Sequence, residues 1–558
     1  MTYRCRNRLT KKWSTMSESF DVVVLGSGAA ALTAAFTAAK EGATVKVFEK
    51  NDKLGGTSAW SGGHVWIANN TQMKAHGLED SVEEGVTYLT ALGHGRVEDR
   101  FVRAIVENGS KMVDYLEENS HVTWDSIPGL PDYHPEHPGG KVGGGRTLGT
   151  PLFPYSELGE WGALIEVNPY YSPFLSMDET PIGAAVPKPP TDEEIARRIA
   201  SDERGQGASL VGLLVKSALE VGVEFAVSTP GVELVVEDGR VVGVIVEGPD
   251  GRHTVRAKKG VILGTGGFEW NKEYVNTFLR GVLHGAASIP TNTGDALTMT
   301  MKIGAALQGM SEAWWVPIAK LPEGINSMNL AMINNDRTVP GSIMVNSRAK
   351  RFTNEAASYN AFGGAFHQLD PSAFGYINIP AWIIHDHDHL VKHGSNGEPY
   401  AGETFPWLVE APTLRELADK LGIDADQLER TVATWNDNVA KRVDPDFHRG
   451  ESAHDRWWGD PYNKGVPEAT LGPIGENGPY YAMELSPGTL GTKGGPKIDE
   501  DARVIDLEGH VIPGLYAVGN ASSPFGPGYP GPGGTHGPNM TFGWLAGKHA
   551  AVVEPTAH

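Results

Sequence analysis

The chain is poor in cysteine, in long apolar runs and in positive charge. Its only cysteine is Cys5, which excludes an internal disulfide and a thiolate metal site, so we expect a reducing, cytoplasmic location and no metal. No run of about 18 apolar residues occurs, which argues against a transmembrane helix. The 47 basic and 68 acidic residues give a net charge of -21, which disfavours nucleic acid as a partner.

The start of the chain, MTYRCRNRLTKKWST, is basic and has no apolar segment behind it. We expect residues 1–17 to be a disordered basic extension, with Met16 as an alternative start. A weak peripheral attachment of this extension to a membrane surface stays open as a second interpretation. With 558 residues, the chain exceeds what one hydrophobic core usually supports, and we expect at least two lobes.

Glycine is abundant, at 70 residues, and is clustered in short motifs. The run FDVVVL, residues 20–25, predicts a buried parallel strand, and an alanine-rich helix and a second strand follow it. Between them, Gly26 permits a tight turn and Gly28 lets the backbone approach a pyrophosphate, which the helix N-terminus at Ala29 and Ala30 would receive. Glu49, at the end of the second strand, is placed to bind a ribose diol. The whole is a dinucleotide-binding βαβ unit.

A second glycine-rich loop, KNDKLGGTSAWSGG, follows Glu49 directly and favours FAD over a nicotinamide cofactor, because FAD must thread its ribityl chain past backbone. Two further strand-then-glycine signatures are VILGTGGFEWN (261–271) and GLYAVGNAS (514–522), and the last helix is expected to begin beyond Pro538. Asp295 is either a ribityl or pyrophosphate neighbour or a helix N-cap. From these motifs the expected cofactor residues, besides those already named, are Lys50, Gly56, Thr57, Ser58, Gly62, Gly63, Gly266, Asp295, Gly519, Asn520, Asn539 and Met540.

These motifs predict an α/β protein with a discontinuous Rossmann-like FAD-binding domain and an inserted α+β substrate or catalytic cap domain. We expect the first part of the FAD-binding domain at 18–310, the cap at 311–473 and the C-terminal part of the FAD-binding domain at 474–558. Residues 151–206, rich in proline and aromatics, form an insertion that is a lid, an oligomer contact or a membrane-facing flap. Trp314 and Trp315 fit either a pocket wall or a packed core.

The stretch YPGPGGTHGPNM, residues 529–540, combines a rigid backbone with a single phenol. Pro530 and Pro532 fix their own φ angles and restrict their neighbours, so Tyr529 is held in one direction. Gly533 has no side chain, and its N–H can meet a ligand directly. The phenol and the amide together are candidate donors to one carbonyl oxygen.

This stretch closely resembles the Tyr-Pro-Gly-Pro-Gly loop of the 3-ketosteroid Δ1-dehydrogenases, flavoproteins of the fumarate reductase superfamily. Two more runs resemble the same family: GSIMVNSRAKRFTNEAASYNAFGG, which contains Tyr359, and PDYHPEHPGG, which contains Tyr133. The RFTNE segment is shared more widely. In fumarate reductases the residue four after its glutamate is a proton-donating arginine, and here it is Tyr359.

The resemblance implies that Tyr359 abstracts the C2 proton of a 3-ketosteroid and that Tyr133 hydrogen-bonds this base. It also implies that Tyr529 and the Gly533 amide polarise the C3 carbonyl while hydride passes from C1 to flavin N5. Residues 50–63 contain no histidine of the sort that tethers flavin in some relatives, and His64 lies beyond the glycines, so we expect non-covalent FAD.

Three other functions stay open: desaturation of another ring position or another cyclic enone, a fumarate-type enoate reductase, and a flavin-binding protein without catalysis. No nicotinamide site is visible, so we expect a quinone-like or protein electron acceptor beside the steroid substrate. The oligomeric state is left open.

Overall fold

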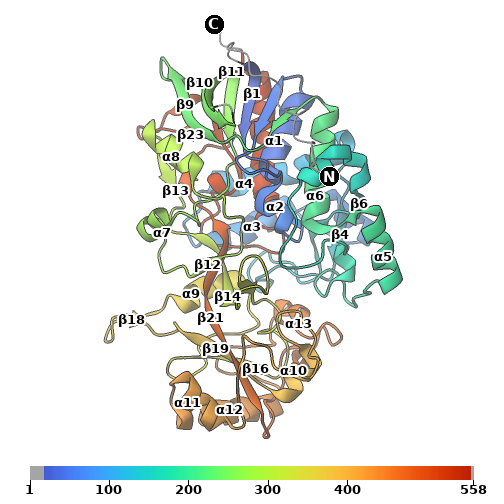
Figure 1. Cartoon of the computed structure of the whole chain (residues 1–558), viewed down its shortest axis with the longest axis vertical. Helices are drawn as coiled ribbons and strands as arrows, with labels where there is room; N and C mark the ends of the chain where they lie inside the picture. The colour runs from blue at the N-terminus through green and yellow to red at the C-terminus, as the bar shows by residue number, and fades with distance from the viewer. Residues whose placement is uncertain (1–17, 250, 555–558) are drawn as a thin grey trace, which may run out of the picture.

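The structure is a computed structural model that describes residues 18–249 and 251–554. The predicted extension, residues 1–17, lies outside the described residues. Figure 1 shows two lobes stacked along the long axis. We call residues 313–485 the lower lobe and the rest of the described chain the upper lobe. Within the described ranges, no helix combines the length and the apolar character that crossing a bilayer requires.

A parallel sheet forms the centre of the upper lobe. Strand β1 (Glu18–Leu25) lies between β11 (Gly251–Leu263) and β2 (Val45–Phe48) and pairs in parallel with both. Residues 22–25 of β1 are at most 1% exposed, as a strand covered on both faces should be. Strand β24 (Val511–Ala517), from near the end of the chain, pairs in parallel with β11. The sheet is therefore assembled from both ends of the sequence, and the predicted α/β class is confirmed.

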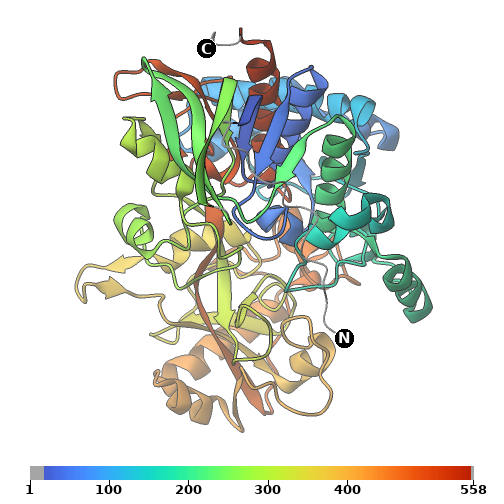
Figure 2. The ribbon, with the colours of Figure 1, turned by 45° about the horizontal axis from the view of Figure 1, so that its top comes forward.

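Helices pack against this sheet and close the cofactor half of the molecule. Helix α1 (Ala29–Lys40) contacts α14 (His536–Val552) and α6 (Gln206–Glu220), and α14 also contacts α4 (Asp99–Asn119). Figure 2 shows α14, in red, beside the blue N-terminal elements. The other elements of this lobe are β8 (Glu224–Ala226), β23 (Arg503–Ile505), α2 (Gly56–Trp60), β3 (Val65–Trp66), α3 (Val82–Gly93), β4 (Asp125–Pro128), β5 (Gly144–Gly149), α7 (Lys272–Phe278), β12 (Gly285–Ala286), α8 (Asp295–Lys302), β13 (Leu307–Gln308) and β22 (Gly495–Pro496).

A β-hairpin extends the upper sheet. Strands β9 (Gly231–Glu237) and β10 (Arg240–Gly248) pair antiparallel, and β10 also pairs with β11. Asp238 and Gly239 both have positive φ, at 49° and 76°, the conformation that a two-residue hairpin turn requires. The hairpin therefore turns at Asp238 and Gly239.

The lower lobe is built on a second, mainly antiparallel sheet in the order β15-β14-β21-β19-β16. Its longest strand is β21 (Tyr480–Thr492), which pairs with β19 at one end and with β14 at the other. Figure 1 shows β21 running from the lower lobe into the upper one. It lies beyond residue 473, where we expected the cap to end. The remaining elements are β14 (Ala313–Lys320), β15 (Leu330–Met332), β16 (Ser342–Asn346), α9 (Phe362–Phe366), β17 (Leu369–Asp370), β18 (Gly375–Tyr376), β19 (Ala381–Asp386), α10 (His387–His393), β20 (Val409–Ala411), α11 (Leu414–Leu421), α12 (Ala425–Ala440) and α13 (Ala453–Trp458).

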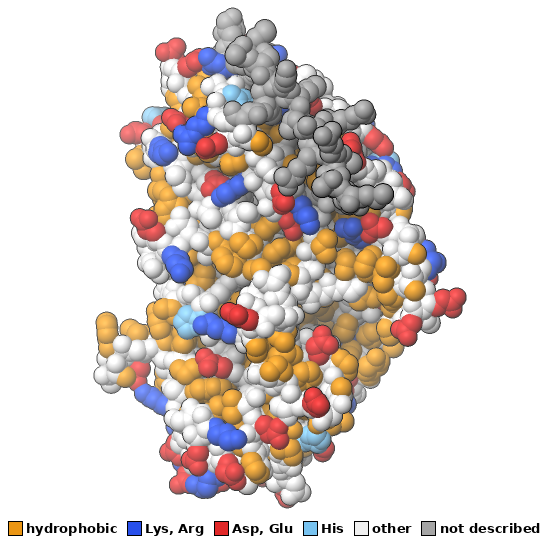
Figure 3. Space-filling model, viewed as in Figure 1, with side chains coloured by type: hydrophobic (Ala, Val, Ile, Leu, Met, Phe, Trp, Pro, Cys, Tyr) orange, Lys and Arg blue, Asp and Glu red, His pale blue; other side chains and the backbone are white. Residues whose placement is uncertain are grey.

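The insertion at residues 151–206 is a compact flank of the upper lobe (Figures 1 and 2). Its two ends are tied together by β6 (Phe153–Pro154) and β7 (Glu203–Arg204), which pair antiparallel. Between them lie two 3-10 helices, Tyr155–Leu164 and Met177–Glu179, and α5 (Asp192–Ser201). Figure 3 shows hydrophobic side chains gathered across the middle of one face of the molecule, where the two lobes meet.

Candidate active site

Two of the predicted cofactor glycines pack so closely against other backbone that no side chain would fit there. Gly26 has a φ of 95°, and a Cβ atom there would lie 2.2 Å from the carbonyl oxygen of Gly264. Gly63 has a φ of 70°, and its Cβ would lie 2.3 Å from the backbone of Gln206. Gly28 is the N-cap of α1, so the positive end of this helix opens beside it. The geometry is that of a backbone cradle for phosphate groups.

Polar side chains at the end of β2 are held in place beside this cradle. The Glu49 carboxylate is buried and accepts hydrogen bonds from Ser27 Oγ at 2.6 Å and from the Asn51 N–H at 2.8 Å. Lys50 Nζ donates to Thr293 Oγ1 at 2.6 Å and pairs with Asp295 at 3.1 Å. Asp295 is the first residue of α8, whose N-cap is Gly294, so the N-cap alternative is wrong and Asp295 is a neighbour of the cradle.

One cavity of about 470 Å³ joins the cradle to the predicted catalytic residues. Its wall contains every predicted site residue except one: Gly26, Gly28, Ala29, Ala30, Glu49, Lys50, Gly56, Thr57, Ser58, Gly62, Gly63, Tyr133, Gly266, Asp295, Tyr359, Gly519, Asn520, Tyr529, Gly533 and Asn539. The exception is Met540, which is fully buried in the first turns of α14 and does not reach the cavity. Its assignment to the cofactor stays a prediction.

Three tyrosines that are far apart in the sequence meet at this cavity. The Tyr133 hydroxyl donates a hydrogen bond to the Tyr359 hydroxyl at 3.0 Å. The ring centroid of Tyr529 lies 5.2 Å from that of Tyr133 and 5.5 Å from that of Tyr359, both in edge-to-face geometry. Thr535 Oγ1 donates to the Tyr529 hydroxyl at 3.1 Å. The three phenols therefore form one buried cluster.

The loop that carries Tyr529 is fixed by hydrogen bonds to its carbonyl oxygens. The Pro530 carbonyl accepts from the Tyr88 hydroxyl at 2.7 Å and from the Tyr133 N–H at 2.9 Å. The Gly533 carbonyl accepts from the N–H groups of Trp66 and Gly537. Gly533 also has a φ of 88°, which favours glycine there. The same loop thus positions Tyr529 and Tyr133 together.

Lys493 anchors the start of this loop, and no motif in the sequence singled it out. Its ammonium group is fully buried and donates to the carbonyls of Gly526 at 2.9 Å and Gly528 at 2.8 Å. It also lies 4.0 Å from the ring centroid of Trp314, whose ring is 4.9 Å from that of Tyr529. Trp314 lines the cavity, whereas its neighbour Trp315 is part of a separate core cluster. The alternation of a strand explains why the two tryptophans divide in this way.

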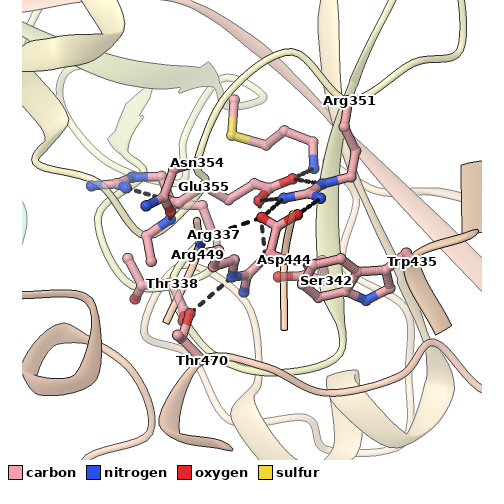
Figure 4. Close-up of polar contacts among 12 residues, drawn as sticks. Arg337, Thr338, Ser342, Arg351, Asn354, Glu355, Trp435, Asp444, Arg449 and Thr470 are labelled. Atoms are coloured by element: carbon pink, nitrogen blue, oxygen red, sulfur yellow. Dashed lines mark hydrogen bonds and ion pairs between the residues drawn. The ribbon is translucent and has the colours of Figure 1, made fainter. Parts of the chain in front are cut away.

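A network of buried charges holds the segment that leads to Tyr359, and Figure 4 shows Glu355 and its arginines within this network. Glu355, four residues before Tyr359, pairs with Arg351 at 2.7 Å and with Arg449 at 3.3 Å. Arg337 donates from Nη1 to the carbonyls of Glu355 and Ala357, the second at 2.7 Å. The backbone that leads into Tyr359 is therefore held on two sides by guanidinium groups. Sequence reasoning pointed to this run but missed Arg337.

Burial raises the pKa of all three phenols. The pKa of Tyr359 lies well above the usual 10.0 because its hydroxyl is desolvated and because anionic neighbours at Tyr133 and Tyr529 would repel its own anion. The pKa of Tyr133 is also well above its usual value, with burial as the largest cause and the Arg337 guanidinium opposing it. Burial likewise raises the pKa of Tyr529. At neutral pH the cluster therefore consists of neutral phenols.

The cavity beyond the tyrosines is mostly apolar. The insertion supplies Leu175, Met177, Pro181 and Ile182 to its wall, together with Tyr171 and Thr180. Among the described residues of the wall, Lys50 is the only lysine or arginine, and it is paired with Asp295. Burial lowers the pKa of His64 to about 3, so this imidazole is neutral. A bulky, uncharged ligand suits such a wall.

Comparison with known proteins places the chain in a family. Residues 21–535 match the family described as FAD binding domain. The chain belongs to this FAD-binding family. A curated 4-oxocyclohexanecarboxylate 2-dehydrogenase from Sinomonas cyclohexanicum is 40% identical over 547 residues, which is 96% of this chain and 94% of the relative. A 3-oxosteroid 1-dehydrogenase from Mycolicibacterium smegmatis is 38% identical over 570 residues, covering 96% and 98%.

A solved structure of a 3-ketosteroid Δ1-dehydrogenase from Sterolibacterium denitrificans, in complex with 1,4-androstadiene-3,17-dione, shares this fold. It has a TM-score of 0.86 and 35% identity, and the match covers 96% of this chain and 100% of the other. The resemblance inferred from the tyrosine motifs is confirmed, and the chain is an FAD-dependent oxidoreductase.

The residues present fit FAD. Gly26, Gly28 and the start of α1 would hold the pyrophosphate, and the Glu49 carboxylate would bind the ribose diol. The Nε2 atom of His64 is buried on the cavity wall and has no hydrogen-bond partner among the described residues, so a bound cofactor would supply one. That the FAD is held without a covalent bond stays a prediction. Among the described residues, no group of three or more His, Cys, Asp or Glu side chains could hold a metal ion.

Proposed function

We propose that the protein is a 3-ketosteroid Δ1-dehydrogenase, which introduces a C1=C2 double bond into the A ring of a 3-ketosteroid. The observation that carries the proposal is the 3.0 Å hydrogen bond between Tyr133 and Tyr359, with the Tyr529 ring within 5.5 Å of both, on one cavity wall. The relatives named for steroid desaturation support it. The upper lobe would bind the cofactor, and the lower lobe, with Tyr359, would act as the catalytic cap.

In this proposal the base is Tyr359, and its anion receives a hydrogen bond from Tyr133. Tyr529 and the Gly533 amide donate to the C3 carbonyl oxygen, which acidifies the C2 hydrogen and stabilises the enolate as it forms. When bound, FAD supplies the acceptor for the hydride that leaves C1. The apolar wall excludes water from the reacting atoms and strengthens the hydrogen bonds to the carbonyl.

The wall also bears on the choice between two substrate classes. The 40% identical relative is named for a substrate with a carboxylate, 4-oxocyclohexanecarboxylate, and this makes a monocyclic keto acid the second candidate. Binding a carboxylate in a buried site calls for a cation, because an unpaired buried charge is very costly. The only lysine or arginine among the described wall residues is Lys50, beside Asp295 and Glu49, so the proposal favours the neutral steroid.

A fumarate-type reductase is a weaker candidate. In fumarate reductases the position four residues after the glutamate that corresponds to Glu355 carries a proton-donating arginine, and here it is Tyr359. The two carboxylates of fumarate would also find only Lys50 as a lysine or arginine among the described wall residues. The electron acceptor is proposed to be a quinone or a protein. A cytoplasmic location, with or without contact to a membrane surface, stays a prediction.

The test is to add 4-androstene-3,17-dione, and separately 4-oxocyclohexanecarboxylate, to the oxidised enzyme without oxygen. The proposal expects the steroid to bleach the visible flavin absorbance and to be recovered with a new double bond at C1–C2. The keto acid should bleach it at least about 100-fold more slowly at equal concentration, since its carboxylate finds no cation. Bleaching by the keto acid alone would replace the proposal with the second candidate.

A further inference from the structure

A second cavity shares Tyr133 with the first. It has a volume of about 380 Å³. Ser358, His454 and Asp455 form its buried part, and His448 and Glu451 form its outer part. The side chains of these last two are 70% and 60% exposed, so the cavity leads from the tyrosine cluster to solvent.

Two polar atoms in the buried part lack a partner. Ser358 is 1% exposed and His454 is 3% exposed, and neither Ser358 Oγ nor His454 Nδ1 has a hydrogen-bond partner among the described residues. Buried polar groups are rarely left unpaired, and a cavity of this size with polar walls has room for several waters at roughly 30 Å³ each. Water is therefore the natural partner of both atoms.

Both atoms belong to residues next to the catalytic pair. Ser358 directly precedes Tyr359 in the chain. The His454 ring packs edge-to-face against the Tyr133 ring, with centroids 5.1 Å apart, and its backbone N–H is capped by Ser452 Oγ at the start of α13. The Tyr133 hydroxyl in turn donates to Tyr359. The base and its tyrosine partner thus lie beside the unpaired polar atoms of the second cavity, with Tyr133 in contact with both sets.

The proposed reaction leaves one proton on the enzyme in every turnover. The C2–H bond breaks and its proton goes to the Tyr359 oxygen, while the electron pair stays in the steroid and forms the C1=C2 bond as hydride leaves C1. Tyr359 is then a buried phenol facing an occupied, apolar cavity. The proton must leave on the other side before Tyr359 can act again.

We propose that the second cavity is the proton exit of the Tyr359–Tyr133 pair and that His454 is its relay residue. The inference rests on the proposed function and adds the route by which the base is reset. Tyr359 passes its proton to Tyr133 as Tyr133 releases its own to His454 Nδ1 or to water beside it, and the proton leaves past His448 and Glu451. His454 acts through Tyr133 and does not touch the substrate.

The charges around His454 suit a relay that stays neutral at rest. Burial holds the pKa of His454 well below its usual range, and the nearby His134 imidazole and Arg337 guanidinium lower it further. Asp455, on the same wall, has a pKa raised by burial to about 6. A neutral imidazole can accept a proton and release it at once, which a permanently charged group cannot do.

The test compares proton release with flavin reduction in one turnover of the holoenzyme with 4-androstene-3,17-dione. The reaction is run without oxygen, in weak buffer with a pH-indicator dye. In the wild type the dye change should follow flavin bleaching without a lag. Tyr359 is a neutral phenol at rest and must lose its proton before it can remove the C2 proton. In His454→Phe, flavin bleaching, proton release and steady-state turnover should therefore all slow by about 10-fold or more, toward the loss typical of a missing proton-transfer group.

Two further variants separate a relay from a structural role. His367→Phe is the matched control, because His367 also has a buried Nδ1 without a hydrogen-bond partner among the described residues but lines neither cavity, and it should keep wild-type rates of bleaching and proton release. His454→Ala opens space at the relay, and added imidazole should restore its turnover and its proton release.

Wild-type rates of bleaching and proton release in His454→Phe, or a slowing of equal size in His367→Phe, would overturn the proton exit while leaving the proposed function intact. Failure of imidazole to restore a folded, flavin-loaded His454→Ala would also overturn it. Absence of bleaching in the wild type would instead overturn the proposed function, and the proton exit with it.

Discussion

At the scale of single residues, the hydroxyl of Tyr359 has to serve as a base although it is buried. Burial favours the neutral phenol, so neighbouring groups must stabilise the Tyr359 anion that acts as the base. The structure offers a hydrogen bond from Tyr133, and the buried Arg337 guanidinium favours negative charge on the tyrosine pair. A phenol with such neighbours can be a base for a carbon acid whose carbonyl is itself polarised.

Replacing Tyr359 by Phe removes the base and leaves the ring. We expect Tyr359→Phe to keep its FAD, because the βαβ cradle is far along the cavity wall, and to lose steady-state steroid turnover by about 10²- to 10⁴-fold. Tyr133→Phe should lose less, since the base remains and only its donor is gone. Turnover is measured by dye-coupled oxidation, and bound flavin by its absorbance spectrum. Wild-type turnover in flavin-loaded Tyr359→Phe would remove Tyr359 from the role of base.

The raised pKa of Tyr359 predicts how activity depends on pH. The reactive form is the anion, whose fraction rises tenfold per pH unit while the pH is below the pKa. Because this pKa lies above its usual value of 10.0, kcat/KM should climb steadily from neutral pH to about pH 9 without a plateau. Steady-state rates across this range with a neutral steroid would check it. A plateau that begins near neutrality would indicate a base of lower pKa.

At the scale of elements, the glycine and proline loop at residues 526–533 is held by four residues from other parts of the chain. Lys493 binds its start, Tyr88 and Tyr133 bind the Pro530 carbonyl, and Thr147 donates to the Pro532 carbonyl at 3.0 Å. The two prolines alone would stiffen the loop but would not aim it. Its direction comes from these tertiary hydrogen bonds.

Lys493→Met should disturb this loop without touching the cavity wall. Methionine has a similar length but no donor, so two buried carbonyls lose their partner, and each such loss costs about 1–3 kcal/mol. We expect a lower thermal unfolding midpoint and a higher KM for the steroid as Tyr529 shifts. Lys497→Met is the control, because its ion pair with Glu98 is partly exposed and contributes little. Equal effects of the two variants would rule out a special role for Lys493.

Glu355 ties the segment that leads to Tyr359 to the rest of the lower lobe. Its carboxylate is fully buried between Arg351 and Arg449, so Glu355→Ala leaves buried guanidinium charge without its partner. We expect a loss of about 3–5 kcal/mol in unfolding free energy, measured by denaturant unfolding of the holoenzyme. Glu429→Ala breaks an exposed pair with Arg415 and should cost no more than about 1 kcal/mol. If Glu355→Ala lost as little unfolding free energy as Glu429→Ala, Glu355 would not stabilise the lower lobe in this way.

The sequence predicted the features of the fold and of the site that depend on residues close together along the chain. The βαβ unit and its glycines follow from local periodicity and turn chemistry. Of all the predicted site residues, only Met540 does not reach the cavity. Met540 differs because the side of a helix that faces a ligand depends on how the helix packs. Lys493, Arg337 and the second cavity could not be predicted, since each depends on contacts between segments that lie far apart along the chain.

At the scale of the whole molecule, a shared strand and the insertion connect the two lobes. Strand β21 belongs to the sheet of the lower lobe and continues into the upper lobe, where β12 pairs with its far end. The insertion at residues 151–206 reaches from the upper lobe to the cavity wall, and Trp457 of the lower lobe donates to the Ile182 carbonyl at 2.8 Å. Of the three roles considered for the insertion, these contacts are those expected of a lid, and this role stays a prediction.

The central claim is that Tyr359 removes the C2 proton of a 3-ketosteroid, and isotope exchange tests it without any oxidation. Enzyme whose flavin has been reduced is incubated with 4-androstene-3,17-dione in D₂O, and deuterium at C2 is followed by NMR. We expect the wild type to exchange one C2 hydrogen and Tyr359→Phe to exchange none above the rate in buffer. Exchange at the wild-type rate in Tyr359→Phe, or no exchange in the wild type, would contradict the account.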